Sequence, residues 1–184
     1  MTVTVEKPQI ISLLYRQEKT DADYGSCLWA RFYLDLKNYT MQIESDCGMF
    51  SYGWRPTPNS ESFLHLLSRL GQDYLLGKLS SQSVIDGATT FETVKGMLEE
   101  IAENECMDLD PFVLEQIESA CYHTNDGRDV IDGVLSELEA TELWNKVDSS
   151  DLWECVEYDY PANAKKIVSV FASCIKPVIK TMED

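Results

Sequence analysis

The sequence predicts an α+β fold, in which a small N-terminal antiparallel sheet with one packed helix precedes an acidic helical region. Segments of strand length that are rich in aromatic and β-branched residues occur in the first third of the chain, whereas apolar residues recur at helical spacing beyond it. Most acidic residues also lie in the second half. We therefore divide the 184 residues into 1–80, the sheet with its helix, and 81–184, the acidic helical region; the two can form one continuous compact domain.

Four segments have the composition of strands, and they are 9–15, 27–36, 39–45 and 48–54. Lys37 and Asn38 form a short connection between the second and third segments, and residues 46–48 separate the third from the fourth. Such short connections favour antiparallel pairing between neighbours in sequence. The expected sheet is therefore a meander of three or four strands.

A helix is expected after the sheet, because Pro56 and Pro58 cannot donate to a strand ladder and Asn59 or Ser60 can cap a helix. Its apolar face consists of Phe63, Leu66, Leu67, Leu70, Tyr74 and Leu75. We predict that this face covers the sheet. The expected core residues are Trp29, Phe32, Phe63, Leu67 and Leu70.

Further helices are predicted in the second half, separated by proline, glycine and capping residues. They cover 90–105, 111–122, about 130–144, 152–156 and the segment after Pro161. Thr89 and Glu92 have the spacing of a capping box, and Asp110 can cap the helix that begins at the following proline. Pro177 is expected to bend the last helix.

Charge is distributed unevenly along the chain. Residues 1–80 contain nine acidic residues against eight basic ones, whereas the segment from Asp86 to Tyr160 has 21 acidic residues against Lys95, Arg128 and Lys146. Solubility alone can account for many acidic surfaces. Ordinary surface helices, however, mix both signs and gain from ion pairs between residues four apart. The shortage of basic residues therefore favours a surface of one sign that binds a partner.

Eleven acidic residues are the candidate binding residues of this surface. They are Glu99, Glu103, Asp110, Glu115, Glu118, Asp126, Asp129, Asp132, Glu137, Glu139 and Glu142. Carboxylates in a helical row lie about 5 to 6 Å apart, which approaches the spacing of phosphates along a nucleic-acid strand. Such a surface can occupy a basic groove built for nucleic acid, and its charge disfavours direct binding of DNA or RNA.

Catalytic and cofactor-binding motifs are absent from the sequence. It contains no P-loop, no dinucleotide-binding glycine motif, no nucleophile elbow and no zinc-protease motif. His65 and His123 lie in different regions, so a catalytic triad would need a fold that the sequence does not indicate. We therefore expect a protein that is not an enzyme and binds no cofactor.

The cysteines are at positions 27, 47, 106, 121, 155 and 174, without a Cys-x-x-Cys pair, and we expect buried free thiols. Cys121 and His123 are close in sequence, but residues two apart on a helix point to different faces, so no metal site is predicted. No apolar run reaches the roughly 18 to 20 residues that span a bilayer, and residues 1–19 lack a signal-peptide core. These features predict a cytoplasmic protein.

Short aromatic motifs within residues 24–80 resemble a group of acidic proteins from phages and other bacterial mobile elements. The resemblance rests on Leu28-Trp29-Ala30-Arg31-Phe32, on the segment from Cys47 to Trp54, on Glu61-Ser62-Phe63-Leu64 and on the segment from Asp73 to Leu79. It implies a mobile-element origin and action inside a bacterial host cell, and it attaches no catalytic residues to these motifs. Small acidic proteins of this origin are similar in class to anti-CRISPR and other anti-defence inhibitors.

Charge and resemblance together lead to one functional hypothesis. The protein is expected to bind a basic nucleic-acid-binding protein or ribonucleoprotein of a host defence system, with a Cas9-type nuclease as the first choice, and to block access of nucleic acid. The alternative is a non-enzymatic structural or regulatory phage protein. In that alternative the partner binds aromatic residues of the sheet, including Tyr39, Phe50, Tyr52 and Trp54, and the acidic residues only confer solubility.

Overall fold

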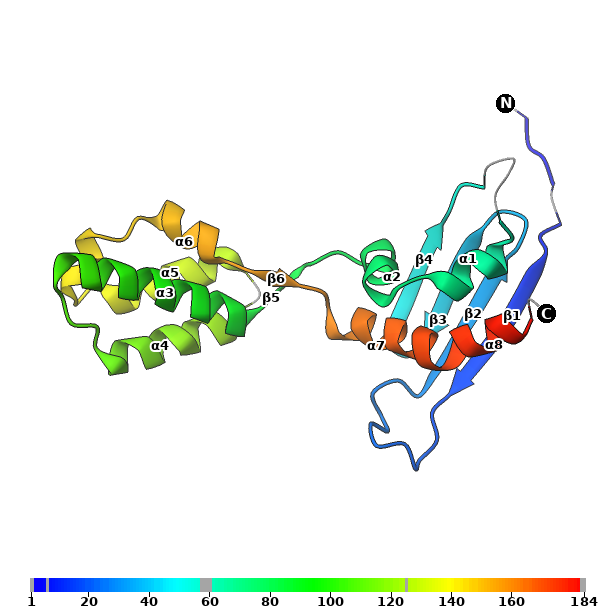
Figure 1. The fold of residues 1–184 in the computed structure, drawn as a ribbon, viewed down its shortest axis with the longest axis horizontal. Helices are drawn as coiled ribbons and strands as arrows, with labels where there is room; N and C mark the ends of the chain where they lie inside the picture. Colours follow the sequence, from blue (N-terminus) through cyan, green and yellow to red (C-terminus); the bar gives the residue numbers. More distant parts are fainter. Residues whose placement is uncertain (1, 6, 57–60, 125, 183–184) are drawn as a thin grey trace. The chain divides into compact units, whose positions relative to one another are not determined.

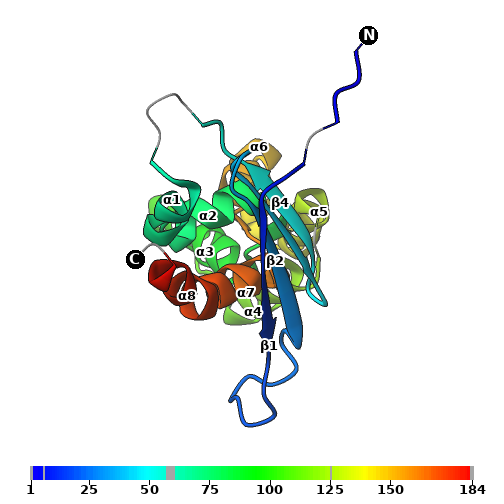
Figure 2. The ribbon, with the colours of Figure 1, turned by 90° about the vertical axis from the view of Figure 1, so that its right-hand side faces the viewer.

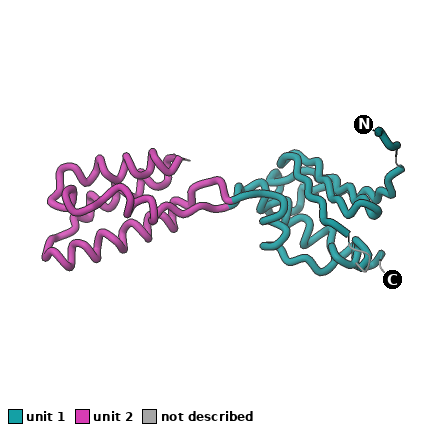
Figure 3. The backbone as a smooth tube through the Cα atoms, turned by 90° about the horizontal axis from the view of Figure 1, so that it is seen from above, with its two compact units in different colours: residues 1–81, 160–184 teal, residues 82–159 magenta. Residues whose placement is uncertain are grey.

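A computed structural model describes residues 2–5, 7–56, 61–124 and 126–182 (Figure 1). It confirms the α+β class and divides the chain into two compact units (Figure 3). The sheet unit comprises Met1–Ser81 and Tyr160–Asp184, and the helical unit comprises Gln82–Asp159. In sequence order, the helical unit therefore follows the four strands of the sheet, and the last helices of the chain belong to the sheet unit again.

The sheet has the predicted meander topology, with the strand order β1-β2-β3-β4 and antiparallel pairing throughout. Its strands are β1 (Ile10–Arg16), β2 (Trp29–Asp35), β3 (Thr40–Ser45) and β4 (Gly48–Gly53). Phe32 lies opposite Leu13 on β1 and opposite Ile43 on β3, so these three side chains share one face. All four predicted strands are confirmed to within about two residues.

Helices cover one face of the sheet, as Figure 2 shows. They are α1 (Phe63–Arg69), α2 (Gln72–Leu79), α7 (Ala162–Val170), the π-helical turn η2 (Phe171–Ile175) and α8 (Lys176–Thr181). The fully buried side chains between the two layers include Phe32, Leu34, Met41, Ile43, Phe63, Leu67, Leu75 and Phe171. Burial of these apolar side chains is the main favourable contribution to the stability of the sheet unit.

Three expectations for the sheet unit need correction. The predicted helix after the sheet is split, because Leu70 adopts an extended ψ of 131° and Gly71 is the N-cap of a second helix. Ser62 caps α1 by accepting a hydrogen bond from the backbone N–H of His65, while the expected caps, residues 59 and 60, lie outside the described residues. Trp29 is not a core residue, because alternation along β2 turns Ala30, Phe32 and Leu34 inward and Trp29 outward.

The C-terminal segment belongs to a different unit from the one in which the sequence division placed it. The sequence pattern assigns this segment to the acidic helical region, but Ile167, Phe171, Ile175 and Ile179 pack into the core of the sheet unit. The bend expected near Pro177 stays a prediction; this proline lies in the first turn of α8, directly after the π-helical turn η2.

The helical unit begins and ends with a two-stranded pairing of β5 (Val84–Ile85) with β6 (Tyr158–Asp159). Between them lie α3 (Gly87–Glu105), α4 (Pro111–Tyr122), α5 (Gly127–Leu138), the 3-10 helix η1 (Glu142–Asn145) and α6 (Ser149–Cys155). Val94, Leu98, Ile117, Val134, Leu138 and Leu152 form its buried core. No helix in the described ranges is both long and apolar enough to cross a membrane.

The helix boundaries in this unit follow the capping residues. The expected capping box at Thr89 and Glu92 is wrong, since Asp86 caps α3 one turn earlier. The expected helix over 130–144 is interrupted after Leu138, and η1 follows as a separate turn. The helix expected at 111–122 is confirmed, with Asp110 as its cap.

Candidate interaction surfaces

The net negative charge of the protein, −17, resides entirely in the helical unit. It holds 21 acidic residues against Lys95, Arg128 and Lys146, a formal net charge of −18. The sheet unit holds the remaining 11 acidic and 12 basic residues, a net charge of +1. The boundary in charge therefore coincides with the boundary between the compact units.

Four aspartates of the helical unit have a structural role as helix caps. Asp86, Asp110, Asp126 and Asp148 accept hydrogen bonds of 2.8 to 3.1 Å from backbone N–H groups in the first turns of α3, α4, α5 and α6. A carboxylate at this position also interacts favourably with the helix dipole. The backbone N–H and the hydroxyl of Ser150 hold the pKa of Asp148 below its ordinary value. Two of the predicted binding residues, Asp110 and Asp126, are thus explained by capping.

The other predicted binding residues lie on three helices and the segment after α5. Glu99 and Glu103 are on α3, Glu115 and Glu118 on α4, and Asp129, Asp132 and Glu137 on α5, with Glu139 and Glu142 following. All are exposed except Glu137, which is half-buried. Residues three or four apart share a helix face, so the α3 pair and the α4 pair each form a short carboxylate row.

Few of these carboxylates are neutralised by basic side chains. The Lys95 Nζ atom lies 3.9 Å from a Glu99 carboxylate oxygen, and the Lys146 Nζ atom lies 2.7 Å from Glu105. Both pairs are substantially exposed, and exposed ion pairs of this kind contribute little to stability. The helical unit therefore presents a surface of predominantly negative charge.

The sheet unit offers a second candidate surface on the face of the sheet opposite its helices. Trp29, Arg31, Tyr33, Leu14 and Met49 alternate with core residues along the strands and point to this open face. Met49 is 82% exposed and Leu14 is 44% exposed. The described helices of the sheet unit all lie on the opposite face.

The open face contains two shallow depressions. One, of about 320 Å³, is lined by Tyr33, Gln42, Ile43, Glu44, Met49, Phe50 and Ser51. The other, of about 490 Å³, is lined by Leu14, Arg16, Gln17, Tyr24, Leu28, Trp29 and Arg31. Aromatic and arginine side chains of this kind are enriched where proteins bind one another.

The aromatic residues that the sequence placed on a binding face lie on the covered side instead. Phe50 and Tyr52 pair with the core residues Ile43 and Met41, so they point toward the helices. The ring centroids of Tyr39 and Trp54 lie 5.1 and 5.6 Å from that of Phe63 on α1. These four aromatics therefore stabilise the covered face, whereas Trp29 and Tyr33 on β2 are aromatic residues that point to the open face.

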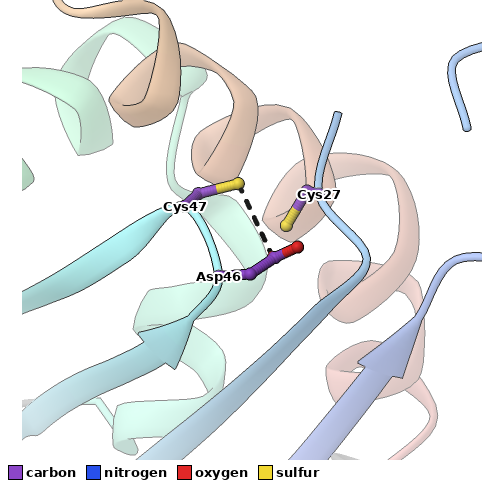
Figure 4. Close-up of side chains that lie close together, drawn as sticks. All are labelled: Cys27, Asp46 and Cys47. Carbon is purple, nitrogen blue, oxygen red and sulfur yellow. Dashed lines mark hydrogen bonds between the residues drawn. The ribbon is translucent and has the colours of Figure 1, made fainter. Parts of the chain in front are cut away.

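A third feature is a cluster of two thiols and a carboxylate at one end of the sheet (Figure 4). Cys27 lies two residues before the start of β2, and Asp46 and Cys47 form the turn between β3 and β4. Their three potential ligand atoms all lie within 4.8 Å of one another. Cys27 is fully buried, Cys47 is half-buried and Asp46 is exposed.

Backbone groups fix the side chains of this cluster. The Leu28 N–H donates a 2.8 Å hydrogen bond to Asp46, and the Cys47 thiol lies 3.2 Å from the Ser26 carbonyl oxygen. Burial opposes ionisation of Asp46, but hydrogen bonds from the backbone N–H groups of Leu28 and Trp29 outweigh it and lower the pKa of this carboxyl. Burial, followed by the neighbouring Cys47, raises the pKa of the Cys27 thiol.

A family model described as a phage family matches residues 3–181 and so spans both units. The chain belongs to this phage family. The phage origin implied by the aromatic motifs of residues 24–80 is therefore confirmed, and the match extends through the acidic helical unit. No curated protein and no solved structure matches this phage family protein significantly.

Sequence reasoning missed the cysteine cluster of the phage family protein, because Cys27 and Cys47 are twenty residues apart. Antiparallel pairing of Ala30 with Ser45 brings the two segments together, so the strand register is the signal that could have found it. Cys121 and His123 do not form such a cluster in the described ranges: Cys121 is buried in the helical core, and the His123 ring nitrogen lies 2.6 Å from the Ser119 carbonyl oxygen.

Proposed function

We propose that this phage family protein is a non-enzymatic inhibitor that acts in the cytoplasm of the bacterial host. The acidic surface of its helical unit docks onto a basic nucleic-acid-binding surface of a defence nuclease, with a Cas9-type effector as the first target to test. The observation that supports this proposal is the confinement of the net charge of −18 to one compact unit, beside a unit of net charge +1.

Helix capping does not account for this concentration of charge. The four capping aspartates leave 17 acidic residues in the helical unit against three basic ones. Repulsion between like charges opposes a compact state, and ordinary surface helices relieve it with basic residues. A basic partner surface would relieve the same repulsion on binding, and complementary charge would also accelerate the encounter.

The mode of inhibition follows from the chemistry of the partner. Nuclease channels that bind nucleic acid neutralise phosphates with lysine and arginine, so an exposed array of carboxylates competes for the same side chains. Paired carboxylates such as Glu115 and Glu118 on α4 supply neighbouring negative charges at the spacing of one helical turn. Steric exclusion of the guide or target strand is the expected consequence.

The open sheet face favours a second candidate function. Its exposed apolar residues and two depressions suit a protein partner that is not strongly basic. In this case the phage family protein is a structural or regulatory component, and Trp29, Tyr33, Leu14 and Met49 form the contact in place of the aromatics named from the sequence.

Binding and cleavage assays at two salt concentrations distinguish the two functions. The intact protein is mixed with purified Cas9-type ribonucleoproteins, and target cleavage and affinity are measured at about 0.1 M and about 0.5 M salt. Docking through the acidic surface predicts inhibition that is strong at the lower concentration and collapses at the higher one. Salt-insensitive binding would support the open sheet face, and capture of no nuclease or nucleic-acid-binding protein from lysates carrying defence systems would count against inhibition.

A further inference from the structure

The geometry points to a zinc-binding site formed by the Cys27 and Cys47 thiolates and the Asp46 carboxylate in the sheet unit. Zn²⁺ binds cysteine sulfur at about 2.3 Å and carboxylate oxygen at about 2.0 to 2.2 Å, so ligand atoms around a tetrahedral ion lie roughly 3.5 to 4 Å apart. The Cys47 sulfur lies 3.9 Å from the nearer Asp46 oxygen, and all three ligand atoms lie within 4.8 Å of one another.

The ligands are held in place by the surrounding backbone. The Leu28 N–H fixes one oxygen of Asp46, so the carboxylate is oriented without help from a metal. The turn that carries Cys47 is held from the other side, because the Asn163 side-chain amide donates a 2.8 Å hydrogen bond to the Cys47 carbonyl oxygen. Gly48 adopts a φ of 129°, which a residue with a side chain rarely tolerates, so this turn requires glycine.

Zinc binding at this site is an exchange of thiol protons for the metal ion, without oxidation or reduction. The Cys47 thiol now donates toward the Ser26 carbonyl and the Cys27 thiol toward the Trp29 carbonyl, at sulfur to oxygen distances of 3.2 and 3.6 Å. Binding replaces two S–H bonds with two Zn–S bonds and releases both protons to solvent. Two thiolates, one carboxylate and Zn²⁺ leave a formal charge of −1 on the site.

An open depression borders Asp46 and Cys47, two of the three ligands. This hollow of about 410 Å³ is lined by Gly25, Ser26, Asp46, Cys47, Ala162, Asn163 and Lys166. Three protein ligands with one open position are typical of zinc sites that hold a water molecule or an exogenous ligand. The bound ion would also join the start of β2 to the β3–β4 turn beside the first turn of α7.

The test uses the intact, reduced protein and inorganic metal ions as probes. Calorimetric titration with zinc chloride should show one specific ion per chain, and Co²⁺ should give the intense thiolate-to-cobalt absorption of a sulfur-ligated site. Cys47→Ser should weaken zinc binding at least about tenfold and remove this absorption. The matched control is Cys106→Ser with Cys174→Ser, because both thiols are exposed and lie outside the cluster.

Asp46→Asn provides a second variant in case loss of a cysteine impairs folding, since an amide oxygen can still accept the Leu28 hydrogen bond. It should weaken zinc binding while the circular dichroism spectrum stays unchanged. Unchanged affinity in Cys47→Ser, or zinc binding that resides on the acidic helices and gives no thiolate absorption, would overturn the proposal. The proposal would also be overturned if Cys27 and Cys47 form a disulfide in the isolated protein and the reduced protein then binds no zinc. None of these outcomes bears on the acidic surface, which belongs to the other unit.

Discussion

The ring of Phe171 packs against the ring of Phe32, with a distance of 6.1 Å between the centroids and an angle of 45° between the planes. Phe32 lies at the centre of the sheet on β2, and Phe171 begins the π-helical turn that follows α7. The contact joins residues separated by the whole helical unit. The fold of the sheet unit therefore depends on the C-terminal elements α7, η2 and α8.

Replacement of Phe171 should destabilise the sheet unit strongly. Phe171→Ala removes a side chain that is 1% exposed, and we expect a loss of about 3 to 5 kcal/mol in the free energy of unfolding. Val178→Ala is the matched control, because Val178 is 44% exposed on the neighbouring α8 and should cost well under about 1 kcal/mol. Urea unfolding followed by circular dichroism measures both. Equal midpoints for the two variants would contradict the packing described here.

Two glycines of α3 should respond oppositely to the same substitution. A Cβ atom at Gly87 would lie 2.7 Å from the Cys121 carbonyl oxygen, where the start of α3 meets the end of α4, whereas Gly96 has open space around it. Gly87→Ala should therefore cost about 1 to 3 kcal/mol through overpacking. Gly96→Ala should stabilise the helix by up to about 1 kcal/mol. Thermal unfolding of both variants tests the close approach, and stabilisation by Gly87→Ala would disprove it.

The strands and most helices could be predicted from the sequence because their signals are local. Alternation of Ala30, Phe32 and Leu34 identifies a strand, and Asp110 before Pro111 identifies a helix start. Trp29 is apolar, but in the same alternation it occupies an outward position and is 36% exposed, so the prediction that it belongs to the core is wrong. The predicted cap at Thr89 is wrong, because the Asp86 carboxylate, one turn earlier, caps α3 instead.

The relationships between distant segments could not be predicted. The amphipathic pattern of residues 162–181 shows that a helix buries one face but not which surface covers it, so its place on the sheet was missed. The Cys27–Asp46–Cys47 cluster likewise depends on strand register, which a hydrophobic pattern fixes only when the pairing partners are known. The exposure of the acidic residues was easier to foresee, since burying an unpaired carboxylate is costly.

Helix capping and partner binding should be separable within the acidic set. Asp126→Ala removes the acceptor for the Arg128 backbone N–H at the start of α5 and should lower the free energy of unfolding by about 1 kcal/mol. Asp132→Ala, one turn into the same helix and exposed, should change stability by less than about 0.5 kcal/mol. Chemical denaturation compares the two variants. If Asp132→Ala is the more destabilising, the assigned roles of these carboxylates are reversed.

Charge reversal should separate function from fold in the helical unit. Glu115→Lys, Glu118→Lys and Asp132→Lys together replace three exposed carboxylates on α4 and α5. The fold should persist, and its stability should be unchanged or slightly raised, because mutual repulsion falls. A control of equal charge change reverses Glu18, Asp21 and Asp73, three exposed acids of the near-neutral sheet unit that line neither depression of the open sheet face. Circular dichroism checks that both triple variants fold.

Against a basic nuclease surface the two triple variants should behave differently. Each reversal in the helical unit removes one attraction and adds one repulsion, so the association rate and the affinity should both fall steeply at about 0.1 M salt. The sheet-unit control has the same total charge and should lose little, because exposed charges farther away than about 8 to 10 Å are screened near physiological ionic strength. Association kinetics and target cleavage provide the measurements. Should the helical-unit variant keep full inhibition while Tyr33→Ala on the open sheet face abolishes it, the acidic surface is not the binding site and the partner binds the sheet, since Tyr33 lines one of its two depressions.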